Sequence, residues 1–188
     1  LLFVDQKKDD YDVILLDLVM PNKDGLHVLE HLYREQADVY GFSCYIWNIE
    51  SMLTLAQTLK SLLPKSCIVL GGPEASYGLE RFENIPWIDA IVRGEGEEAM
   101  LSLCQAVREG RDYPRISGET AVTFADAGVH YRPDEETGGI LYYESSRGCP
   151  YSCAYCLSSA THGVRFKSVE QTCHGFTLFS LCISSFLC

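Results

Sequence analysis

The chain has 188 residues, a formal net charge of −11 and 47% hydrophobic residues, enough for one globular domain and part of a second. The negative charge argues against a nucleic-acid-binding function, because such proteins normally carry a basic surface. No stretch has the length of a membrane span or the character of a signal peptide. We therefore expect a cytoplasmic protein with neither a nucleic-acid nor a membrane partner.

Strands and helices alternate along the first part of the chain. The predicted strands, which are near-continuous apolar runs, are residues 13–18, 39–43, 67–70 and 88–92. The predicted helices, whose apolar residues recur at helical spacing, are 25–34, 49–63 and 97–108, with a short irregular or helical piece at 74–82. Apolar strands separated by helices are typical of a parallel sheet that is buried on both faces. The sequence therefore predicts a doubly wound α/β domain with its ligand crevice at the carboxyl ends of the strands.

Small and flexible residues follow three of these predicted strands. The positions concerned are Ser43, Gly71, Gly72, Gly94, Glu95 and Gly96. Glycine lets a backbone approach a ligand closely, and exposed N–H groups can face a phosphate. Tight strand–helix turns use the same residues, so each position taken alone fits an ordinary turn equally well.

A connector follows, from residue 111 to 139, punctuated by glycines and prolines. Within it, residues 120–124 and 129–131 predict a small hairpin. The apolar run at 140–143 predicts a short strand that leads into a cysteine-rich loop.

That loop carries Cys149, Cys153 and Cys156 in a C-x3-C-x2-C run. Three thiolates on one short loop can converge on a single iron–sulfur cluster and leave one iron without a protein ligand. A zinc site is the alternative, but it usually needs four ligands and paired cysteine or histidine spacings. The odd total of nine cysteines also favours reduced thiols over a disulfide scaffold.

The run resembles the motif of the radical SAM family, and Tyr155 fills the aromatic position before the third cysteine. The resemblance implies a [4Fe-4S] cluster on the three cysteines that binds S-adenosyl-L-methionine and reduces it to a 5′-deoxyadenosyl radical. It also implies that Tyr155 packs near the adenosyl group, and that a reductant such as flavodoxin or ferredoxin supplies the electron.

Residues 32–110 resemble the cobalamin-binding domain that precedes the barrel in one branch of radical SAM enzymes, which implies a flavodoxin-like sheet. In that comparison Ser43, Gly71 and Gly72 match positions along the nucleotide tail of the corrinoid, and the turn at 94–96 lies beside them. The Asp-x-His-x-x-Gly sequence that supplies a cobalt ligand in many such domains is absent. His27 has the wrong spacing and is expected at the surface or partly buried. The lower face of cobalt would then be empty, water-ligated or shielded by protein.

Residues 11–32 resemble the middle of a response-regulator receiver domain, with Asp17 at the phospho-acceptor position. The acidic pair that would hold magnesium, and the later hydroxyl residue and lysine, have no convincing equivalents. We interpret this segment as a receiver-like βα unit that completes the sheet. A signalling receiver phosphorylated at Asp17 is one alternative function, and a non-catalytic corrinoid or iron–sulfur binding module is another.

The sequence thus predicts five segments: a receiver-like piece at 1–32, a cobalamin-binding-like domain at 33–110, a linker with a hairpin at 111–139, the start of a radical SAM domain at 140–170, and an apolar tail at 171–188. Few residues follow Cys156, so we expect the first unit of a partial (β/α) barrel and a catalytically incomplete fragment. The implied function is radical-based methyl transfer, or a related modification, on an unknown substrate. No catalytic side chain is assigned.

Overall fold

The computed structural model describes residues 13–16, 25–118, 143–160 and 163–173. The chain divides into two compact units, Leu1–Ala121 and Val122–Cys188. The first unit contains a five-stranded sheet in which every strand pair is parallel and the strand order is β1-β2-β3-β4-β5. Its strands are β1 (Val13–Leu16), β2 (Val39–Ser43), β3 (Cys67–Gly71), β4 (Ala90–Val92) and β5 (Ile116–Ser117).

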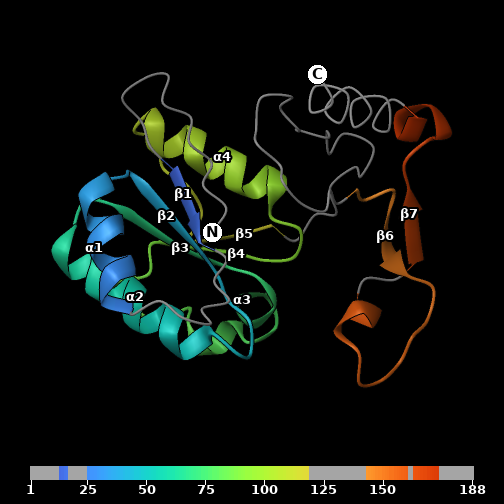
Figure 1. The fold of residues 1–188 in the computed structure, drawn as a ribbon, viewed down its shortest axis with the longest axis horizontal. Helices are drawn as coiled ribbons and strands as arrows, with labels where there is room; N and C mark the ends of the chain where they lie inside the picture. Colours follow the sequence, from blue (N-terminus) through green and yellow to red (C-terminus); the bar gives the residue numbers. More distant parts are fainter. Residues whose placement is uncertain (1–12, 17–24, 119–142, 161–162, 174–188) are drawn as a thin grey trace, which may run out of the picture. The chain divides into compact units, whose positions relative to one another are not determined.

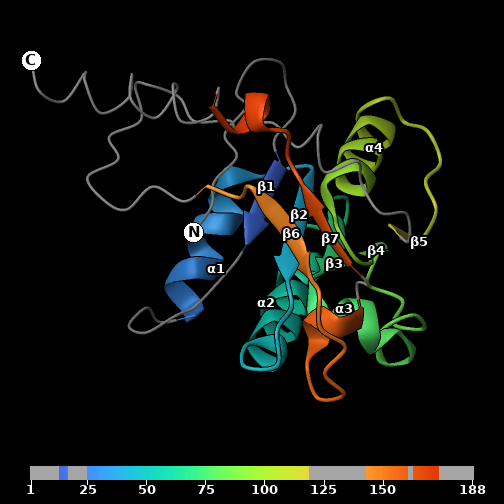
Figure 2. The ribbon, with the colours of Figure 1, turned by 90° about the vertical axis from the view of Figure 1, so that its right-hand side faces the viewer.

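Helices cover both faces of this sheet (Figures 1 and 2). On one face lie α1 (Gly25–Glu35) and α2 (Ile49–Leu62), and on the other lies α4 (Glu97–Arg108). The short helix α3 (Pro73–Tyr77) and the 3₁₀ turn η1 (Leu79–Arg81) connect β3 to β4. The predicted doubly wound α/β fold is confirmed for this unit.

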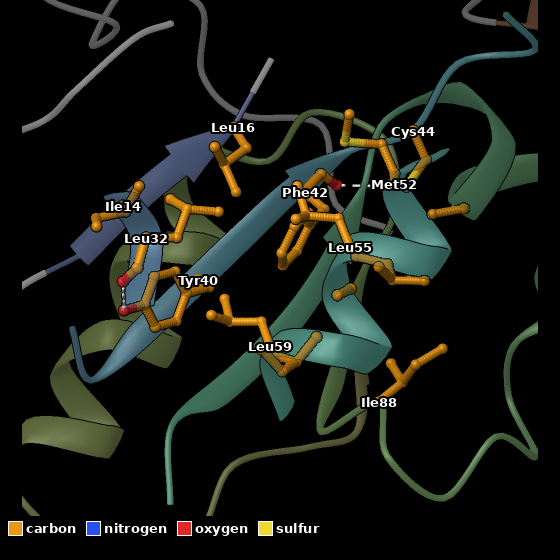
Figure 3. Packing of buried hydrophobic residues seen from close by; sticks show 14 of the residues in the cluster. Ile14, Leu16, Leu32, Tyr40, Phe42, Cys44, Met52, Leu55, Leu59 and Ile88 are labelled. Carbon is orange, nitrogen blue, oxygen red and sulfur yellow. Dashed lines mark hydrogen bonds between the residues drawn. The ribbon is translucent and has the colours of Figure 1, made fainter. Parts of the chain in front are cut away.

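Alternation along the strands explains why both faces are apolar. Successive side chains of a strand point to opposite faces, so Tyr40 and Phe42 pack with α1 and α2 (Figure 3). Val39 faces the α4 side, and the paired residues of β3 follow the same alternation. On the α4 side, a Cβ at Gly41 would lie 2.6 Å from a methyl carbon of Leu15 and 3.4 Å from that of Met100. Gly41 therefore allows the close packing of α4 on the sheet.

One buried hydroxyl fixes the chain between α1 and β2. Tyr40 is fully buried, and its hydroxyl donates to the carbonyl of Leu32 at 2.7 Å (Figure 3). The same hydroxyl accepts from the N–H of Ala37 at 2.9 Å. Both bonds satisfy backbone groups at the end of α1, where no further helical partner exists. Gln36 takes a left-handed conformation there, with φ of 51°.

The sequence predicted β2 and α4 to the residue, and α1, α2 and β3 to within one residue at the ends that the structure describes. The predicted strand at 88–92 is shorter, because only Ala90–Val92 join the sheet. Near the start of the predicted linker at 111–139, β5 pairs with β4 and extends the sheet by one strand. The predicted hairpin at 120–131 and the end of the first strand, at 17–18, lie outside the described residues.

In the second unit, β6 (Ser146–Cys149) pairs antiparallel with β7 (Gly163–Phe166) (Figure 2). Residues 169–173 are helical. At the start of this helix the N–H of Ser168 donates to the side-chain oxygen of Gln171, and the N–H of Gln171 donates to the hydroxyl of Ser168, as in a capping box. The predicted strand at 140–143 was misplaced at its end, because Tyr143 lies in no strand and β6 begins at Ser146. Residues 140–142 are outside the described part.

Within the described ranges, no helix is both long and apolar enough to cross a membrane.

Candidate functional site

The carboxyl ends of β2 and β3 meet at Gly72, which has a left-handed backbone with φ of 86°. A Cβ at this position would lie 2.9 Å from both the backbone nitrogen and the backbone oxygen of Cys44, and 3.4 Å from Oγ of Ser43. The N–H of Cys44 donates to the carbonyl of Gly71 at 2.8 Å, and the N–H of Glu74 donates to the carbonyl of Cys44 at 3.0 Å. Only glycine combines this conformation with such close backbone packing.

Gly71 has more space for a side chain than Gly72 does. A Cβ there would meet the carbonyl oxygen of Val92 at 3.7 Å, an ordinary contact. The backbone conformation of Gly71 is one that any residue adopts, because it is not among the glycines with positive φ. Gly71 is therefore not required by the fold itself, whereas Gly72 is.

The loop after β2 is shaped by Asn48, which is buried. Its side-chain N–H donates to the carbonyl of Ser43 at 3.0 Å, and its side-chain oxygen accepts from the N–H of Tyr45 at 2.8 Å. The tight turn leaves Ile46 and Trp47 at the surface, with 78% and 66% exposed. Trp47 stacks on Tyr45 at 4.6 Å between ring centroids, with 10° between the planes. An exposed aromatic and aliphatic surface thus borders the glycine turn.

A second link joins this turn to the end of β4 through Ser76 on α3. The Ser76 hydroxyl donates to the carbonyl of Gly72 at 2.8 Å and accepts from the N–H of Gly94 at 2.9 Å. The side chain of Arg93 donates to the carbonyl of Ser76 at 3.2 Å. Gly94 itself has φ of 67°. The structure therefore brings Ser43, Gly72 and Gly94 to one edge of the sheet, as predicted.

Glu95 and Gly96 lie farther along the same turn. Gly96 precedes α4, and its carbonyl accepts from the N–H of Met100 at 2.8 Å. Glu95 lines a cavity of about 340 Å³ against α4, together with Ser102, Tyr113 and Gly118. Ser117 also lines it, and its buried hydroxyl has no hydrogen-bond partner among the described residues.

Cys44 directly follows β2 beside the Gly72 turn, but its thiol is not available as a ligand. Its side chain is fully buried, and its Sγ lies 3.5 Å from the carbonyl oxygen of Phe42. Burial raises the pKa of this thiol to about 12, with a smaller raising effect from the charge of Glu74. The thiol is therefore neutral near pH 7, and a neutral thiol is a poor metal ligand.

The predicted cluster ligands lie at the end of β6 and on the loop that follows it. Cys149 ends β6 and is half-buried, like Cys153, while Cys156 is exposed. The N–H of Cys156 donates to the carbonyl of Cys153 at 3.1 Å, which forms a turn. In the described ranges no three His, Cys, Asp or Glu side chains converge closely enough to hold a metal ion. The three cysteines have the residue type and spacing of cluster ligands, but their thiols do not converge on one point in this structure.

Gly148 fixes the start of the cysteine loop. It has φ of 103°, and a Cβ there would lie 2.2 Å from the carbonyl oxygen of Gly163 on β7. Arg147 makes a two-pronged ion pair with Glu144, at 3.0 and 2.7 Å. Tyr155, the aromatic residue of the motif, is 93% exposed.

Two further residues were considered from the sequence, His27 and Asp17. His27 lies on α1 and is exposed, in agreement with the expected surface or partly buried position. Asp17 lies outside the described residues. Sequence reasoning missed Ser76 and Asn48, whose contacts join residues from different elements. A serine in a short helix and an asparagine before a helix are too common to be singled out from sequence.

Residues 4–103 of the chain match the B12 binding domain family. A 2-(S-pantetheinyl)-carbapenam-3-carboxylate methyltransferase of Streptantibioticus cattleyicolor is 31% identical over 63% of this chain and 22% of that protein. The cobalamin-dependent radical SAM methyltransferase TokK of Streptomyces tokunonensis is 27% identical over 72% of this chain and 24% of the relative. An anaerobic magnesium-protoporphyrin IX monomethyl ester cyclase of Rubrivivax gelatinosus is 29% identical over 77% of this chain and 31% of the relative.

The chain therefore spans between about a fifth and a third of the length of these relatives. The family match covers the parallel sheet up to β4 and the first part of α4, to residue 103, including Ser43, Gly72 and Gly94 at the strand ends. It also includes the segment that resembles a receiver domain. Because the match extends over more than half of the chain and coincides with the doubly wound sheet, this protein belongs to the B12-binding domain family.

Proposed function

We propose that the crevice at the ends of β2, β3 and β4 binds cobalamin through its nucleotide tail. The observation that supports this most directly is the glycine turn at Gly72, where a left-handed glycine packs directly on the backbone of Cys44 at the strand ends. Ligands of doubly wound sheets bind outside the carboxyl ends of the strands. Ser43, Gly71 and Gly94 would then lie along the tail, with Glu95 and Gly96 beyond them.

The corrinoid ring itself is large and mainly apolar, so it needs an apolar surface beside the tail site. Ile46 and Trp47 provide such a surface next to the glycine turn, and the Asn48 side chain holds the loop that carries them. No histidine occurs in this loop or in the turns after β3 and β4. In this proposal the loop would offer apolar side chains to the corrinoid, and neither the loop nor these turns would supply a histidine ligand.

The second part of the proposal concerns the cysteine loop. Cys149, Cys153 and Cys156 would hold a [4Fe-4S] cluster that binds S-adenosyl-L-methionine, with Tyr155 beside the adenosyl group. A relative that matches 72% of this chain is a cobalamin-dependent radical SAM methyltransferase, which supports this part of the proposal. The cofactors would supply the radical and the methyl group, and the protein would bind and orient them. The protein would act in the cytoplasm, take electrons from a flavodoxin or ferredoxin, and transfer a methyl group to, or otherwise modify, an unknown substrate.

Gly71 offers the sharpest test of the cobalamin site. A Gly72→Val change would collide with the Cys44 backbone, so a loss of binding would not be separable from a loss of folding. Gly71→Ala adds a methyl group that the fold accommodates, at the strand end where a ligand must approach closely. We expect hydroxocobalamin to bind the parent chain in equilibrium dialysis, and the Gly71→Ala variant to bind about tenfold more weakly, or about 1.4 kcal/mol.

Gly25→Ala is the matched control, because nothing lies within 4 Å of a Cβ at Gly25 on α1. This variant should bind hydroxocobalamin like the parent. Far-UV circular dichroism and urea unfolding of all three proteins check that the fold is kept. A well-folded parent chain that binds no hydroxocobalamin would refute the proposed function.

A further inference from the structure

We infer that Ser76 is a positioning residue that sets the spacing between the Gly72 and Gly94 turns and so determines affinity for the nucleotide tail of a corrinoid. The inference rests on the proposed function, because it assigns a role to a residue of the same crevice. Ser76 is one of three polar residues that are buried in the described part of the chain, with 6% exposed.

The hydroxyl of Ser76 both donates and accepts a hydrogen bond, and its two partners lie on different loops. A serine hydroxyl has one proton to donate and lone pairs to accept. Here the proton goes to the carbonyl of Gly72, on the turn after β3, and a lone pair accepts the N–H of Gly94, on the turn after β4. A serine hydroxyl often bonds the carbonyl four residues earlier in its own helix, but such a bond does not reach another element. The bond from the Gly94 N–H to the Ser76 hydroxyl, in contrast, joins α3 to the turn after β4.

The backbone of Ser76 adds to this connection. Its N–H donates to the carbonyl of Gly72 at 3.0 Å, and its carbonyl accepts from the side chain of Arg93 at 3.2 Å. Gly72 and Gly94 both have positive φ, a conformation that glycine enters without strain but is also free to leave. A fixed hydrogen bond between the two turns therefore restricts the part of the crevice that is otherwise least constrained.

Removal of the Ser76 hydroxyl should weaken only the link between the Gly72 turn and the Gly94 turn. In Ser76→Ala, the carbonyl of Gly72 still accepts from the N–H of residue 76, so the turn after β3 keeps one bond. The N–H of Gly94 loses its protein partner and turns to water, since Gly94 is exposed. The strands and the buried clusters do not involve this hydroxyl. The distance between the two turns then fluctuates, and a ligand that contacts both has to restore it on binding.

The experiment compares two corrinoids on the full chain. Hydroxocobalamin carries the nucleotide tail, whereas cobinamide has the same ring without the nucleotide. We expect Ser76→Ala to weaken hydroxocobalamin binding about tenfold in equilibrium dialysis, the typical effect of one lost hydrogen bond, and to leave cobinamide binding unchanged. Ser76→Thr keeps the hydroxyl and should bind hydroxocobalamin within about twofold of the parent. A general loss of structure would affect both corrinoids equally.

Ser61→Ala is the matched control. Ser61 lies in the last turn of α2, and its hydroxyl donates to the carbonyl of Gln57 at 2.9 Å, the same bond to the fourth preceding residue but without a link to another loop. Amide hydrogen exchange gives a second measurement that needs no corrinoid: Ser76→Ala should speed exchange at Gly94 by about tenfold and leave the amides of β2 and β3 unchanged. If Ser76→Ala unfolds, Ser76→Cys replaces it, because the thiol fills the same space but is a weak donor and acceptor.

The outcomes separate the two claims. A folded parent that binds no hydroxocobalamin refutes the proposed function, and this inference with it. A parent that binds, together with a Ser76→Ala variant that binds both corrinoids as tightly as the parent, refutes only the role of Ser76. Equal weakening for hydroxocobalamin and cobinamide also refutes it, because the effect would not depend on the tail.

Discussion

Buried polar atoms at single residues hold the first unit in register. The Tyr40 hydroxyl is the clearest case, because it satisfies the carbonyl of Leu32 and the N–H of Ala37 from within the apolar layer between the sheet and α1. Without that hydroxyl, two backbone groups at the end of α1 would lose their partners. The cost of an unsatisfied buried group exceeds the net gain from a hydrogen bond.

We expect Tyr40→Phe to lower the free energy of unfolding by about 2–4 kcal/mol, because one hydroxyl serves two buried backbone groups. The measurement is urea unfolding followed by tryptophan fluorescence, since Trp47 and Trp87 both lie in the first unit. Tyr33→Phe, on the exposed side of α1, is the control and should change the value by less than about 0.5 kcal/mol. An equally small change for Tyr40→Phe would show that water satisfies the freed groups.

At this scale the sequence located the glycines of the crevice but not the residues that hold them. Gly71, Gly72 and Gly94 stand directly after apolar strands, and position along a strand is visible in sequence. The bond between Ser76 and Gly94 joins residues eighteen positions apart, on α3 and after β4. Such a contact depends on how the loops pack, and no local pattern of residues encodes it.

Among the elements, β6 and β7 show how the cysteine loop is presented. The two strands pair antiparallel from Ser146 opposite Phe166 to Cys149 opposite Gly163, so the loop leaves the pair at Cys149. Gly148 allows the close approach at this end. The first thiol is therefore anchored on a strand, while Cys153 and Cys156 belong to the loop itself, which a cluster would have to draw inward.

We expect anaerobic reconstitution with iron and sulfide to give the broad visible absorption of a thiolate-bound cluster. Single replacement of Cys149, Cys153 or Cys156 by Ala should abolish it, because the remaining two thiols cannot hold a cubane with one open iron. Cys173→Ala removes an exposed thiol from the same unit and is the control. Loss of the absorption in Cys173→Ala but not in Cys153→Ala would overturn the ligand assignment.

The elements that the sequence predicted well share one property, a strong apolar pattern. β2, β3 and α4 are bounded by abrupt changes in hydrophobicity, and their ends were found within one residue. β5 has two residues at the sheet edge, and β6 reads Ser-Arg-Gly-Cys, which has no buried residue and no alternation of apolar and polar residue types. Backbone pairing alone defines these strands, so their side chains carry no period that a sequence can reveal.

For the first unit as a whole, two buried thiols link stability to pH. Burial raises the pKa of Cys44 to about 12 and that of Cys67 to about 11, from an ordinary value of 9.0. Cys67 lies at the opposite end of the sheet, with its Sγ 3.3 Å from the hydroxyl of Tyr113. Above pH 9 the unfolded chain releases thiol protons that the folded chain retains. The contribution of these thiols is therefore complete below pH 9 and lost as the pH rises toward 11 and 12.

We expect the free energy of unfolding of the parent to fall between pH 9 and 11 by up to about 1.4 kcal/mol per pH unit for each thiol. Cys44→Ala should flatten this slope by the share of one thiol, although it lowers stability at pH 7 through the cavity it leaves. Urea unfolding under reducing conditions at several pH values measures both effects. Cys173→Ala serves as the control for loss of an exposed thiol. A slope in Cys44→Ala equal to that of the parent would contradict the prediction.

The turn at Gly72 also determines which kinds of substitution can probe this site. Its contacts are made by backbone atoms, namely the N–H and carbonyl of Cys44, the carbonyl of Gly71 and the N–H of Glu74. Truncating a side chain to alanine leaves every one of these atoms in place. An alanine scan would therefore miss these backbone contacts and register only where a glycine gains a methyl group or where Ser76 loses the hydroxyl that binds Gly72. Here, informative substitutions are those that enlarge a residue.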